Sequence, residues 1–472
     1  MPKRGQIVEL VVDSAAYEGV SVARLEGLVV FVRNAVPGDR VRALIRRKKK
    51  TYAEATVEEV LQPSTSRVEP RCPYFGVCGG CRWQNVDYSR QLEFKQQQVE
   101  DLFSRIGQLD SPEVRPTLAS PNSYYYRNKM EFTFGTHRWL RKEEIESGRE
   151  LSKGFALGLH VPRRFDRILD LETCYLQSAL SAQIVNAFRA LALKHKWSAY
   201  DSRKHEGYLR NLVIRSGQQT GEIMVNLVTS RNEGARMEVA KEVLLAAFPG
   251  ITTLVNSVNP TRSPVAGGEE RVYHGDGSIT EQIAHLRFRI APTVFFQPNT
   301  GQAERLYAII RDLADLKGGE TVYDLYSGVG CISLFLAPTA KRVVGVESGQ
   351  AAVETARQSA AENGITNCVF HAGDALEGLG AGMIERYGSP DLAVVDPPRP
   401  GLDRKMCQAI LEAAPPRLLY VSCNPATQAR DLKLLAPGYR VEVIQPIDMF
   451  PHTHHIETVV RLARLQGGLG VG

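Results

Sequence analysis

The C-terminal part of the chain repeats one pattern, in which a short apolar run ends in a polar residue and a helix-forming segment follows. Five runs end in this way, at Asp324, Glu347, Asp374, Asp396 and Cys423. Continuous apolar runs of this length are typical of strands that are covered on both faces of a parallel sheet. In such sheets ligands bind at the carboxyl ends of the strands. From about residue 291 the sequence therefore predicts an α/β domain whose ligand-binding edge carries acids and one thiol.

The first of these runs continues into a glycine-rich turn that suits a nucleoside-bearing cofactor. Gly328 and Gly330 permit close approach of the backbone to a ligand. Glu347 ends the next strand, 23 residues after Asp324, where a carboxylate can accept hydrogen bonds from ribose hydroxyls. A single Gly-x-Gly can also be an ordinary turn. The chain lacks the third glycine of a dinucleotide motif and the Gly-Lys-Ser/Thr of a P-loop, which disfavours NAD and ATP and favours S-adenosylmethionine.

Cys423 follows the apolar run Leu418–Val421 and precedes Asn424 and Pro425, which favour a turn. This position puts a thiol where an α/β enzyme commonly carries its reactive groups. The alternative is an inert core cysteine, since cysteine is among the residues most often buried. The stretch alone leaves both interpretations open.

Residues 1 to about 62 alternate short apolar runs with turns, a spacing that predicts a small β-barrel of about five strands. Between residues 40 and 50, seven of eleven residues are Arg or Lys and none is acidic. A charge run of this kind is commonly only a solvated face. On a small barrel, a shape that often binds oligonucleotides, it also suits contacts with phosphate groups, and we expect such contacts.

Three of the eight cysteines, Cys72, Cys78 and Cys81, crowd into one glycine-containing segment. Thiolates at this spacing can converge on one metal centre if a fourth ligand comes from elsewhere, and Cys174 is the nearest candidate. Four thiolates suit either zinc or an iron–sulfur cluster, and the spacing does not separate the two. Ordinary reduced cysteines are the alternative.

The length of 472 residues fits about three domains. No apolar run reaches the roughly 18 residues that a membrane-spanning helix needs, and the first residues lack the apolar region of a signal peptide. We therefore expect a cytoplasmic protein that acts as a monomer and has no membrane partner. A net charge of +6 permits a nucleic-acid partner without requiring one.

Two segments between the barrel and the α/β domain have clear local patterns. Residues 88–106 carry apolar residues at helical spacing, with Asp87 placed to cap the helix and Gly107 to end it. Residues 138–153 are rich in charge, which predicts a solvated loop.

Five motifs, taken in their order along the chain, resemble the RNA uracil-C5-methyltransferase family, whose members make 5-methyluridine from S-adenosylmethionine. They are Phe295–Asn299, Asp324–Gly330, Asp396–Arg399, Ser422–Pro425 and His455–Glu457. The barrel in turn resembles the TRAM domain, an RNA-binding OB-like fold. The resemblance implies three domains: an OB-like barrel over residues 1–64, a central α+β domain over 65–290, and a Rossmann-like methyltransferase domain over 291–472.

The resemblance also implies ligands for particular residues. The residues that would contact S-adenosylmethionine are Gln297, Tyr326, Glu347 and Asp396, with Asp374 near the adenine. The ligands of a [4Fe–4S] cluster, here favoured over zinc, would be Cys72, Cys78, Cys81 and Cys174. Some tRNA-specific relatives lack both barrel and cluster. Their presence therefore favours ribosomal RNA, most simply 23S RNA, as the substrate, with tRNA as the alternative.

The chemistry of this family explains why a thiol and an acid are needed together. Uracil C5 is a weak nucleophile until a thiolate adds at C6, and a base must later remove the proton from C5. Cys423 is the proposed nucleophile and Glu457 the proposed base. A free cysteine is only a few per cent thiolate at neutral pH, so we expect the site to lower the pKa of Cys423.

Two rival functions remain. An amino-group methyltransferase also has Asp-Pro-Pro after a strand, but it usually carries an aromatic residue next, where this chain has Arg399. A non-catalytic iron–sulfur protein that binds RNA is the second rival. The histidines at 452, 454 and 455 lie in one turn-prone stretch without a distant partner, which indicates a structural or RNA-facing role and not a metal site.

Overall fold

The computed structural model describes residues 2–109, 112–148, 150–162 and 164–465. The chain divides into two compact units. The first unit comprises Met1–Gly76, Gly80–Ser123 and Leu379–Gly472, and the second comprises Val77–Gly79 and Tyr124–Gly378. Each unit therefore gathers segments that are far apart in the sequence.

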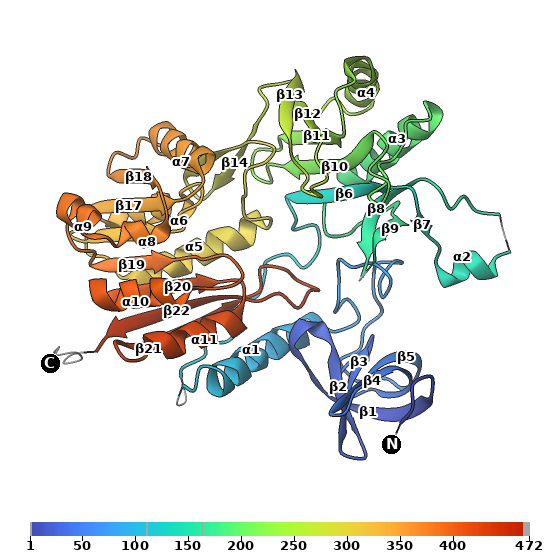
Figure 1. The fold of residues 1–472 in the computed structure, drawn as a ribbon, viewed down its shortest axis with the longest axis horizontal. Coiled ribbons are helices and arrows are strands. Elements are labelled where there is room, and N and C mark those ends of the chain that lie inside the picture. Colours follow the sequence, from blue (N-terminus) through green and yellow to red (C-terminus); the bar gives the residue numbers. More distant parts are fainter. Residues whose placement is uncertain (1, 110–111, 149, 163, 466–472) are drawn as a thin grey trace. The chain divides into compact units, whose positions relative to one another are not determined.

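The first unit begins with a closed five-stranded barrel, drawn in blue in Figure 1. Its strands, in the order in which they pair, are β1 (Ile7–Ala15), β2 (Ser21–Leu25), β3 (Leu28–Arg33), β5 (Tyr52–Gln62) and β4 (Arg40–Lys48). A short 3₁₀ turn, η1 (Tyr17–Gly19), lies between β1 and β2. Alternate residues such as Val8, Leu10 and Val12 fill the barrel core, as the period of two in a strand requires. The predicted barrel is confirmed.

Helix α1 (Tyr88–Arg105) follows the barrel and belongs to the same unit. Asp87 caps it by accepting a hydrogen bond from the backbone N–H of Ser89. The predicted helix is confirmed, but its buried face differs from the predicted apolar stripe. Beside Val99 and Phe103, the fully or nearly fully buried residues include Gln91, Lys95 and Gln98.

The remainder of the first unit is an α/β layer formed by the C-terminal residues. Its strands, in order of pairing, are β19 (Leu392–Val395), β20 (Arg417–Ser422), β22 (Glu457–Arg464) and β21 (Tyr439–Ile447). Helix α9 (Ala381–Tyr387) precedes these strands, and α10 (Arg404–Ala413) and α11 (Pro425–Leu435) lie between them in the sequence. Strands β19 and β20 are parallel, whereas β22 is antiparallel to β20. The last two strands thus form a hairpin at the end of the layer.

The second unit contains an eight-stranded mixed sheet over the central part of the chain (Figure 1). Its strands, in order of pairing, are β13 (Glu269–His274), β12 (Thr253–Val258), β11 (Ile223–Thr229), β10 (Leu209–Ser216), β6 (Lys129–Gly135), β8 (Ala156–Val161), β9 (Arg164–Asp170) and β7 (Arg138–Trp139). Helices α3 (Ala179–Lys194) and α4 (Gly234–Ala247) pack into its core cluster through residues such as Phe188 and Leu244.

The segment 138–153, predicted as a solvated loop, is partly ordered. It contributes strand β7 and the short helix α2 (Lys142–Glu146). An ion pair of 2.6 Å between Arg138 and Glu144 joins the two elements, which explains why a charge-rich sequence takes a regular form here.

The second unit also carries three parallel strands with glycine-rich turns, namely β18 (Cys368–Ala372), β17 (Arg342–Glu347) and β16 (Thr321–Leu325) in order of pairing. The other elements of this part are β14 (Ile279–Ile283), β15 (Leu286–Ile290), α5 (Thr300–Ala314), α6 (Cys331–Leu336), η2 (Ala337–Thr339), α7 (Gln350–Glu362) and α8 (Ala375–Gly378). The predicted alternation of strand, turn and helix is confirmed. No helix within the described ranges is long and apolar enough to cross a membrane.

Candidate active site

The turn after β16 has the backbone that a close ligand contact requires. Gly328 and Gly330 have φ values of 55° and 80°, and Tyr326 has a φ of 66°, which is uncommon for a residue with a side chain. A Cβ atom at Gly330 would lie 2.9 Å from the ring of Phe370. A strained, tightly packed turn of this kind is typical of ligand-binding sites.

Glu347, at the end of β17, holds this turn from the neighbouring strand. Its carboxylate accepts hydrogen bonds from the backbone N–H groups of Gly328 at 3.1 Å and Gly349 at 2.7 Å. The acid and the glycine turn, which lie 19 residues apart in the sequence, are therefore brought together. Asp374 follows β18, is exposed, and accepts a hydrogen bond from Leu376 N at the start of α8.

Asp324, the first residue of the glycine-turn motif, is a buried acid. Its side chain is fully buried at the end of β16, where Ser333 Oγ donates a hydrogen bond of 2.5 Å to Oδ2. Its Oδ1 has no hydrogen-bond partner in the described structure. Burial raises the pKa of Asp324 to about 7. An acid inside an apolar strand was the signal that could have identified it.

Gln297 lies just before α5, and its backbone is held by the central sheet. Asn128 Nδ2 donates to Gln297 O at 2.8 Å, and Asn128 N donates to Pro298 O at 2.8 Å. Phe296 is buried with its ring 5.7 Å from that of Phe288, whereas Phe295 is 74% exposed. The motif thus presents an exposed aromatic ring two residues before Gln297, and no pattern in the sequence indicated this exposure.

In the first unit, the end of β19 lies beside the turn that carries Cys423. Asp396 is half-buried at the end of β19, and Arg399 is exposed three residues later. The carbonyl oxygen of Arg399 accepts hydrogen bonds from Asn424 Nδ2 and Thr427 Oγ1, both of 3.2 Å. The Asp396–Arg399 motif and the Cys423 turn are therefore one hydrogen-bonded structure.

Cys423 and Glu457 are brought together by the register of two antiparallel strands. Ser422 of β20 pairs with Thr458 of β22, and Thr458 Oγ1 donates to Ser422 O at 3.2 Å. Carrying this register one residue further sets Cys423 opposite Glu457, and opposed residues project to the same face of a sheet. Cys423 is half-buried and Glu457 is buried.

The electrostatics of this pair differ from the expectation for the thiol. Burial, followed by the negative charge of Asp396, raises the pKa of Glu457 well above its usual range, and Arg399 opposes this rise. Burial and the neighbouring Glu457 raise the pKa of Cys423 to about 11, although a hydrogen bond and the charge of Arg399 lower it. The site without substrate therefore holds a thiol and not the thiolate that we expected, because apolar surroundings and a nearby acid outweigh one exposed cation.

Of the three histidines before Glu457, His452 is buried and His454 and His455 are half-buried. His452 is buried, and its Nδ1 lies 3.1 Å from Gln91 Nε2. Burial lowers the pKa of both His452 and His454 to about 4, so both rings are neutral at physiological pH. No group of three or more His, Cys, Asp or Glu side chains in the described ranges is arranged to hold a metal ion.

The four cysteines predicted as cluster ligands are all half-buried. In the first unit, Gln84 links two of them, since Nε2 donates to Cys81 Sγ at 3.2 Å and Oε1 accepts from Cys72 N at 3.1 Å. In the second unit, burial raises the pKa of Cys174, although backbone hydrogen bonds from Leu176 and Gln177 oppose the rise. Thiols and N–H groups directed at sulfur fit the chemistry of a cluster, but a gathered ligand set is absent from the described residues.

The basic run of the barrel lies on β4, and its arginines face acids on neighbouring strands. The four ion pairs are Arg40–Glu9, Arg42–Glu59, Arg46–Glu58 and Arg47–Glu54, at 2.9 to 3.5 Å. Lys49 and Lys50 are exposed at the turn that leads to β5. The sequence could not show this compensation, because the acids come from other strands. The positive charge of the run is therefore concentrated at its C-terminal end.

Known proteins resemble this chain both in its C-terminal part and in its barrel. Residues 276–465 match the family described as tRNA (Uracil-5-)-methyltransferase, and residues 3–57 match the TRAM domain. An uncharacterized RNA methyltransferase of Bacteroides thetaiotaomicron is 44% identical, covering 95% of this chain and 99% of the relative. One of Chlorobaculum tepidum is 43% identical and covers 98% of each chain.

A solved structure is similar over nearly the same range. It is the tRNA (uracil-54, C5)-methyltransferase of Pyrococcus abyssi in complex with S-adenosyl-L-homocysteine, which is 28% identical with a TM-score of 0.75. The match covers 96% of this chain and 99% of that chain. The fold is therefore that of an S-adenosylmethionine-dependent methyltransferase with an N-terminal TRAM barrel, and the chain belongs to the RNA uracil-5-methyltransferase family.

Proposed function

We propose that this enzyme transfers a methyl group from S-adenosylmethionine to C5 of a uridine in RNA through a covalent adduct with Cys423. The observation that carries the proposal is the strand register that sets Cys423 opposite a buried acid, Glu457. A nucleophile and a base on the same face of one sheet are what C5 methylation of uracil requires.

In this proposal the Cys423 thiol releases its proton to solvent water as the uracil enters, while Glu457 stays ionised, and the thiolate sulfur forms a bond with C6. The electron pair of the C5=C6 bond moves toward C5 and the O4 carbonyl. S-adenosylmethionine, when bound, supplies the methyl group, which C5 takes as the bond from methyl to sulfonium breaks. Glu457 then accepts the proton from C5, the C5=C6 bond re-forms, and the Cys423 sulfur leaves C6. Burial raises the pKa of Glu457 well above its usual range, which makes its carboxylate a stronger base than an exposed one.

Gln297, Tyr326, Glu347 and Asp396, with Asp374 near the adenine, are the residues that we assign to S-adenosylmethionine. The hydrogen bonds of Glu347 to the glycine turn support this assignment, because the same carboxylate is free to exchange these partners for ribose hydroxyls. The positive φ of Tyr326 supports it too, since strain of this kind is maintained where a ligand needs it.

Two RNA classes are proposed as substrates. The barrel and the cysteine segment favoured ribosomal RNA, most simply 23S RNA. The similar Pyrococcus enzyme, which is named for a tRNA position, matches 96% of this chain, so these segments do not separate the two classes. Transfer RNA therefore stands beside ribosomal RNA. Methyl transfer to unmodified total RNA, followed by mapping of the labelled uridine, decides between them.

We further propose that Cys72, Cys78, Cys81 and Cys174 hold a [4Fe–4S] cluster, which carries no step of the methyl transfer. Four thiols and the N–H groups directed at Cys81 and Cys174 support it. Anaerobic purification should give a brown protein with about four iron atoms per chain. Stoichiometric zinc in a colourless protein would contradict the cluster and leave the methyltransferase proposal untouched.

We keep the three-domain division as a proposal: a barrel over 1–64, a central domain over 65–290, and a methyltransferase domain over 291–472. It assigns RNA binding to the first, the cysteine site to the second and the chemistry to the third. We also propose that the enzyme is monomeric and cytoplasmic.

The decisive test is the variant Cys423→Ala, assayed with labelled S-adenosylmethionine and unmodified total RNA. We expect no methyl transfer to RNA, while binding of the cofactor stays within about twofold of wild type. The matched control is Cys407→Ala, a buried cysteine on α10. Activity that survives Cys423→Ala would favour transfer to a base amino group, a reaction that needs no thiol. RNA binding by wild type without any methyl transfer would favour the non-catalytic rival.

A further inference from the structure

The loop that precedes Glu457 lies outside the strand ladder that positions the rest of the hairpin. Ile447 and Glu457 form the pair at the open end of the β21–β22 ladder, and residues 448–456 connect them. Within this loop His452 has a φ of 64°, a backbone conformation that side chains rarely adopt. The ladder alone therefore does not determine where the loop runs.

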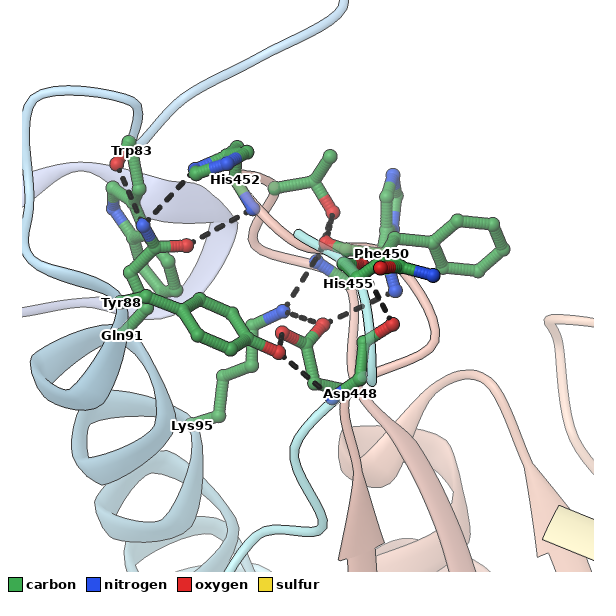
Figure 2. A network of polar contacts seen from close by, with 11 residues as sticks. Trp83, Tyr88, Gln91, Lys95, Asp448, Phe450, His452 and His455 are labelled. Carbon is green, nitrogen blue, oxygen red and sulfur yellow. Dashed lines mark hydrogen bonds and ion pairs between the residues drawn. The ribbon is translucent and has the colours of Figure 1, made fainter. Parts of the chain in front are cut away.

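Helix α1 supplies fixed points for this loop at its beginning, as Figure 2 shows. Lys95 Nζ lies 2.6 Å from Asp448 Oδ1, and both side chains are fully buried. Tyr88 OH donates to Asp448 Oδ2 at 2.9 Å, and Phe450 N donates to Asp448 Oδ1 at 3.1 Å. Lys95 Nζ also donates to Phe450 O at 3.3 Å. One ammonium group thus holds both a side chain and a backbone carbonyl of the loop.

Gln91, one turn earlier on the same helix, holds the middle of the loop. Its Oε1 accepts from His452 N at 2.9 Å, and its Nε2 lies 3.1 Å from His452 Nδ1. The same Nε2 donates to the carbonyl oxygens of Trp83 and Val86. The backbone N–H groups of Arg82 and Trp83 in turn donate to His452 O. His452 is therefore fixed at both its N–H and its carbonyl group (Figure 2).

Contacts inside the loop carry this fixed geometry toward Glu457. Thr453 Oγ1 donates to Phe450 O at 2.7 Å and accepts from His455 N at 3.3 Å. The rings of Phe450 and His455 meet edge to face at 5.9 Å. His455 is two residues before Glu457. A displacement of Asp448 or His452 would therefore also displace His455 and, through it, the backbone at Glu457.

A buried ion pair is a weak means of stabilising a fold, because apolar side chains of similar volume do so equally well. Its directional contacts do fix the position of a backbone segment. The strand register sets Glu457 opposite Cys423, but Glu457 belongs to the terminal pair of the β21–β22 ladder. We infer that Gln91 and Lys95 are positioning residues for the base, since they hold the 448–456 loop that enters β22 at Glu457 and thereby keep this terminal pair in place. This inference rests on the proposed function of Glu457. Cys423 is held separately, by β20 and α11.

The inference makes a step-specific prediction. If Glu457 is misplaced while Cys423 is not, sulfur addition and methyl transfer proceed, but removal of the C5 proton is slowed. Methylated RNA then stays bonded to Cys423. The measurement is a single turnover of the full chain with unmodified total RNA and methyl-labelled S-adenosylmethionine. Label in a protein–RNA band stable to denaturing gel is compared with label in released RNA.

For Gln91→Leu we expect at least a tenfold rise in the ratio of adduct to released methylated RNA, with the rate of methyl incorporation within about threefold of wild type. The control is Gln98→Leu. Gln98 is buried on the same face of α1, and its side chain makes no hydrogen bond in the described structure. It should leave the ratio at the wild-type value.

Lys95→Met leaves Asp448 without its cation and can impair folding, so it is paired with the double variant Lys95→Met/Asp448→Asn, which is neutral. We expect the double variant also to accumulate adduct. Wild-type ratios in both the Gln91→Leu and the double variant would overturn the inference. Parallel loss of methyl incorporation and release in folded variants would overturn it too, since that pattern indicates general damage.

Glu457→Gln separates this inference from the proposed function. If Glu457→Gln accumulates adduct and Gln91→Leu does not, the positioning role of Gln91 is wrong, whereas the assignment of Glu457 as the base is supported. If Glu457→Gln accumulates no adduct, the assignment of the base is wrong, and with it the inference that depends on that assignment.

Discussion

At the scale of residues, the chemistry that we propose depends on two side chains that one ladder brings together. The pairing of Ser422 with Thr458 sets Cys423 opposite Glu457, and the pKa of each is raised because both side chains are withdrawn from water. In the sequence, the order of the five motifs predicted these two residues as the reactive pair. The sequence could not predict that both side chains are withdrawn from water, or that Cys423 is therefore a thiol in the absence of substrate.

The first prediction concerns Glu457→Gln, which keeps the size of the side chain and removes the base. We expect turnover to fall by roughly 10²- to 10⁴-fold, the usual contribution of a general base. Multiple-turnover methylation of RNA measures this loss. The control Glu412→Gln, at an exposed position on α10, should keep wild-type turnover. An undiminished rate in Glu457→Gln would exclude the residue as the base.

The second prediction concerns the buried acid Asp324. Its pKa is raised from 3.8 to about 7, so the unfolded chain releases this proton at lower pH than the folded chain does. The free energy of unfolding should therefore fall as pH rises from about 4 to about 7, by about 4 kcal/mol from this group. The variant Asp324→Asn has no titratable group at this position, so its free energy of unfolding should not show this fall.

Chemical denaturation of wild type and Asp324→Asn at pH 4, 6 and 8 tests it. The variant should match wild type at the lowest pH and exceed it at pH 8. The exposed Asp312, which is ion-paired with Arg311, provides the control Asp312→Asn. A difference between wild type and Asp324→Asn that does not change with pH would be the contrary outcome.

At the scale of elements, turns and loops carry the features that matter most. The glycine turn after β16 combines positive φ values with contact against Phe370. Helix α1 shows how far tertiary structure can depart from a pattern. Its apolar spacing predicted a helix correctly, but two of its most deeply buried side chains are Gln91 and Lys95, because they bind the 448–456 loop.

The third prediction tests the turn. Gly330→Ala places a Cβ atom 2.9 Å from the Phe370 ring at a φ of 80°, so we expect S-adenosylmethionine affinity to fall at least tenfold in titration calorimetry. Gly364→Ala is the matched control, with a φ of 67° and open space around the added carbon. Both variants carry backbone strain of about 1–2 kcal/mol, so they differ in the close contact and in lying inside or outside the turn after β16. Equal affinities in the two variants would show that the turn tolerates a side chain.

At the scale of the whole molecule, the net charge of +6 says little about where RNA is bound. The arginines of β4 are matched by glutamates on neighbouring strands, and such exposed pairs contribute little to stability while cancelling charge. The cations that remain for phosphate groups are therefore better sought at the tip of the barrel, at Lys49 and Lys50.

The fourth prediction follows from this distribution. Lys49→Gln/Lys50→Gln should weaken RNA binding and reduce the slope of log affinity against log salt by up to about 2, since each phosphate contact contributes about one unit. Filter binding at several salt concentrations measures both. Arg40→Gln/Arg42→Gln removes equal charge from ion-paired positions and should change the slope less. The reverse ranking would assign RNA contact to the strand and not to the turn.

The sequence by itself determined the barrel, helix α1, the strand–turn–helix alternation and the family, because these depend on local periodicity and on short motifs read along the chain. It also predicted Cys423 and Glu457 as the nucleophile and the base, because their motifs can be recognised in the order of residues along the chain. Tertiary structure alone decided which charges are cancelled, which acids are buried and what holds the loop before Glu457. Ion pairs such as Arg42–Glu59 and Lys95–Asp448 join residues far apart in the chain, and desolvation depends on everything packed around a group. Neither the pairing of charges nor the desolvation of a group can therefore be predicted from a single segment of the sequence.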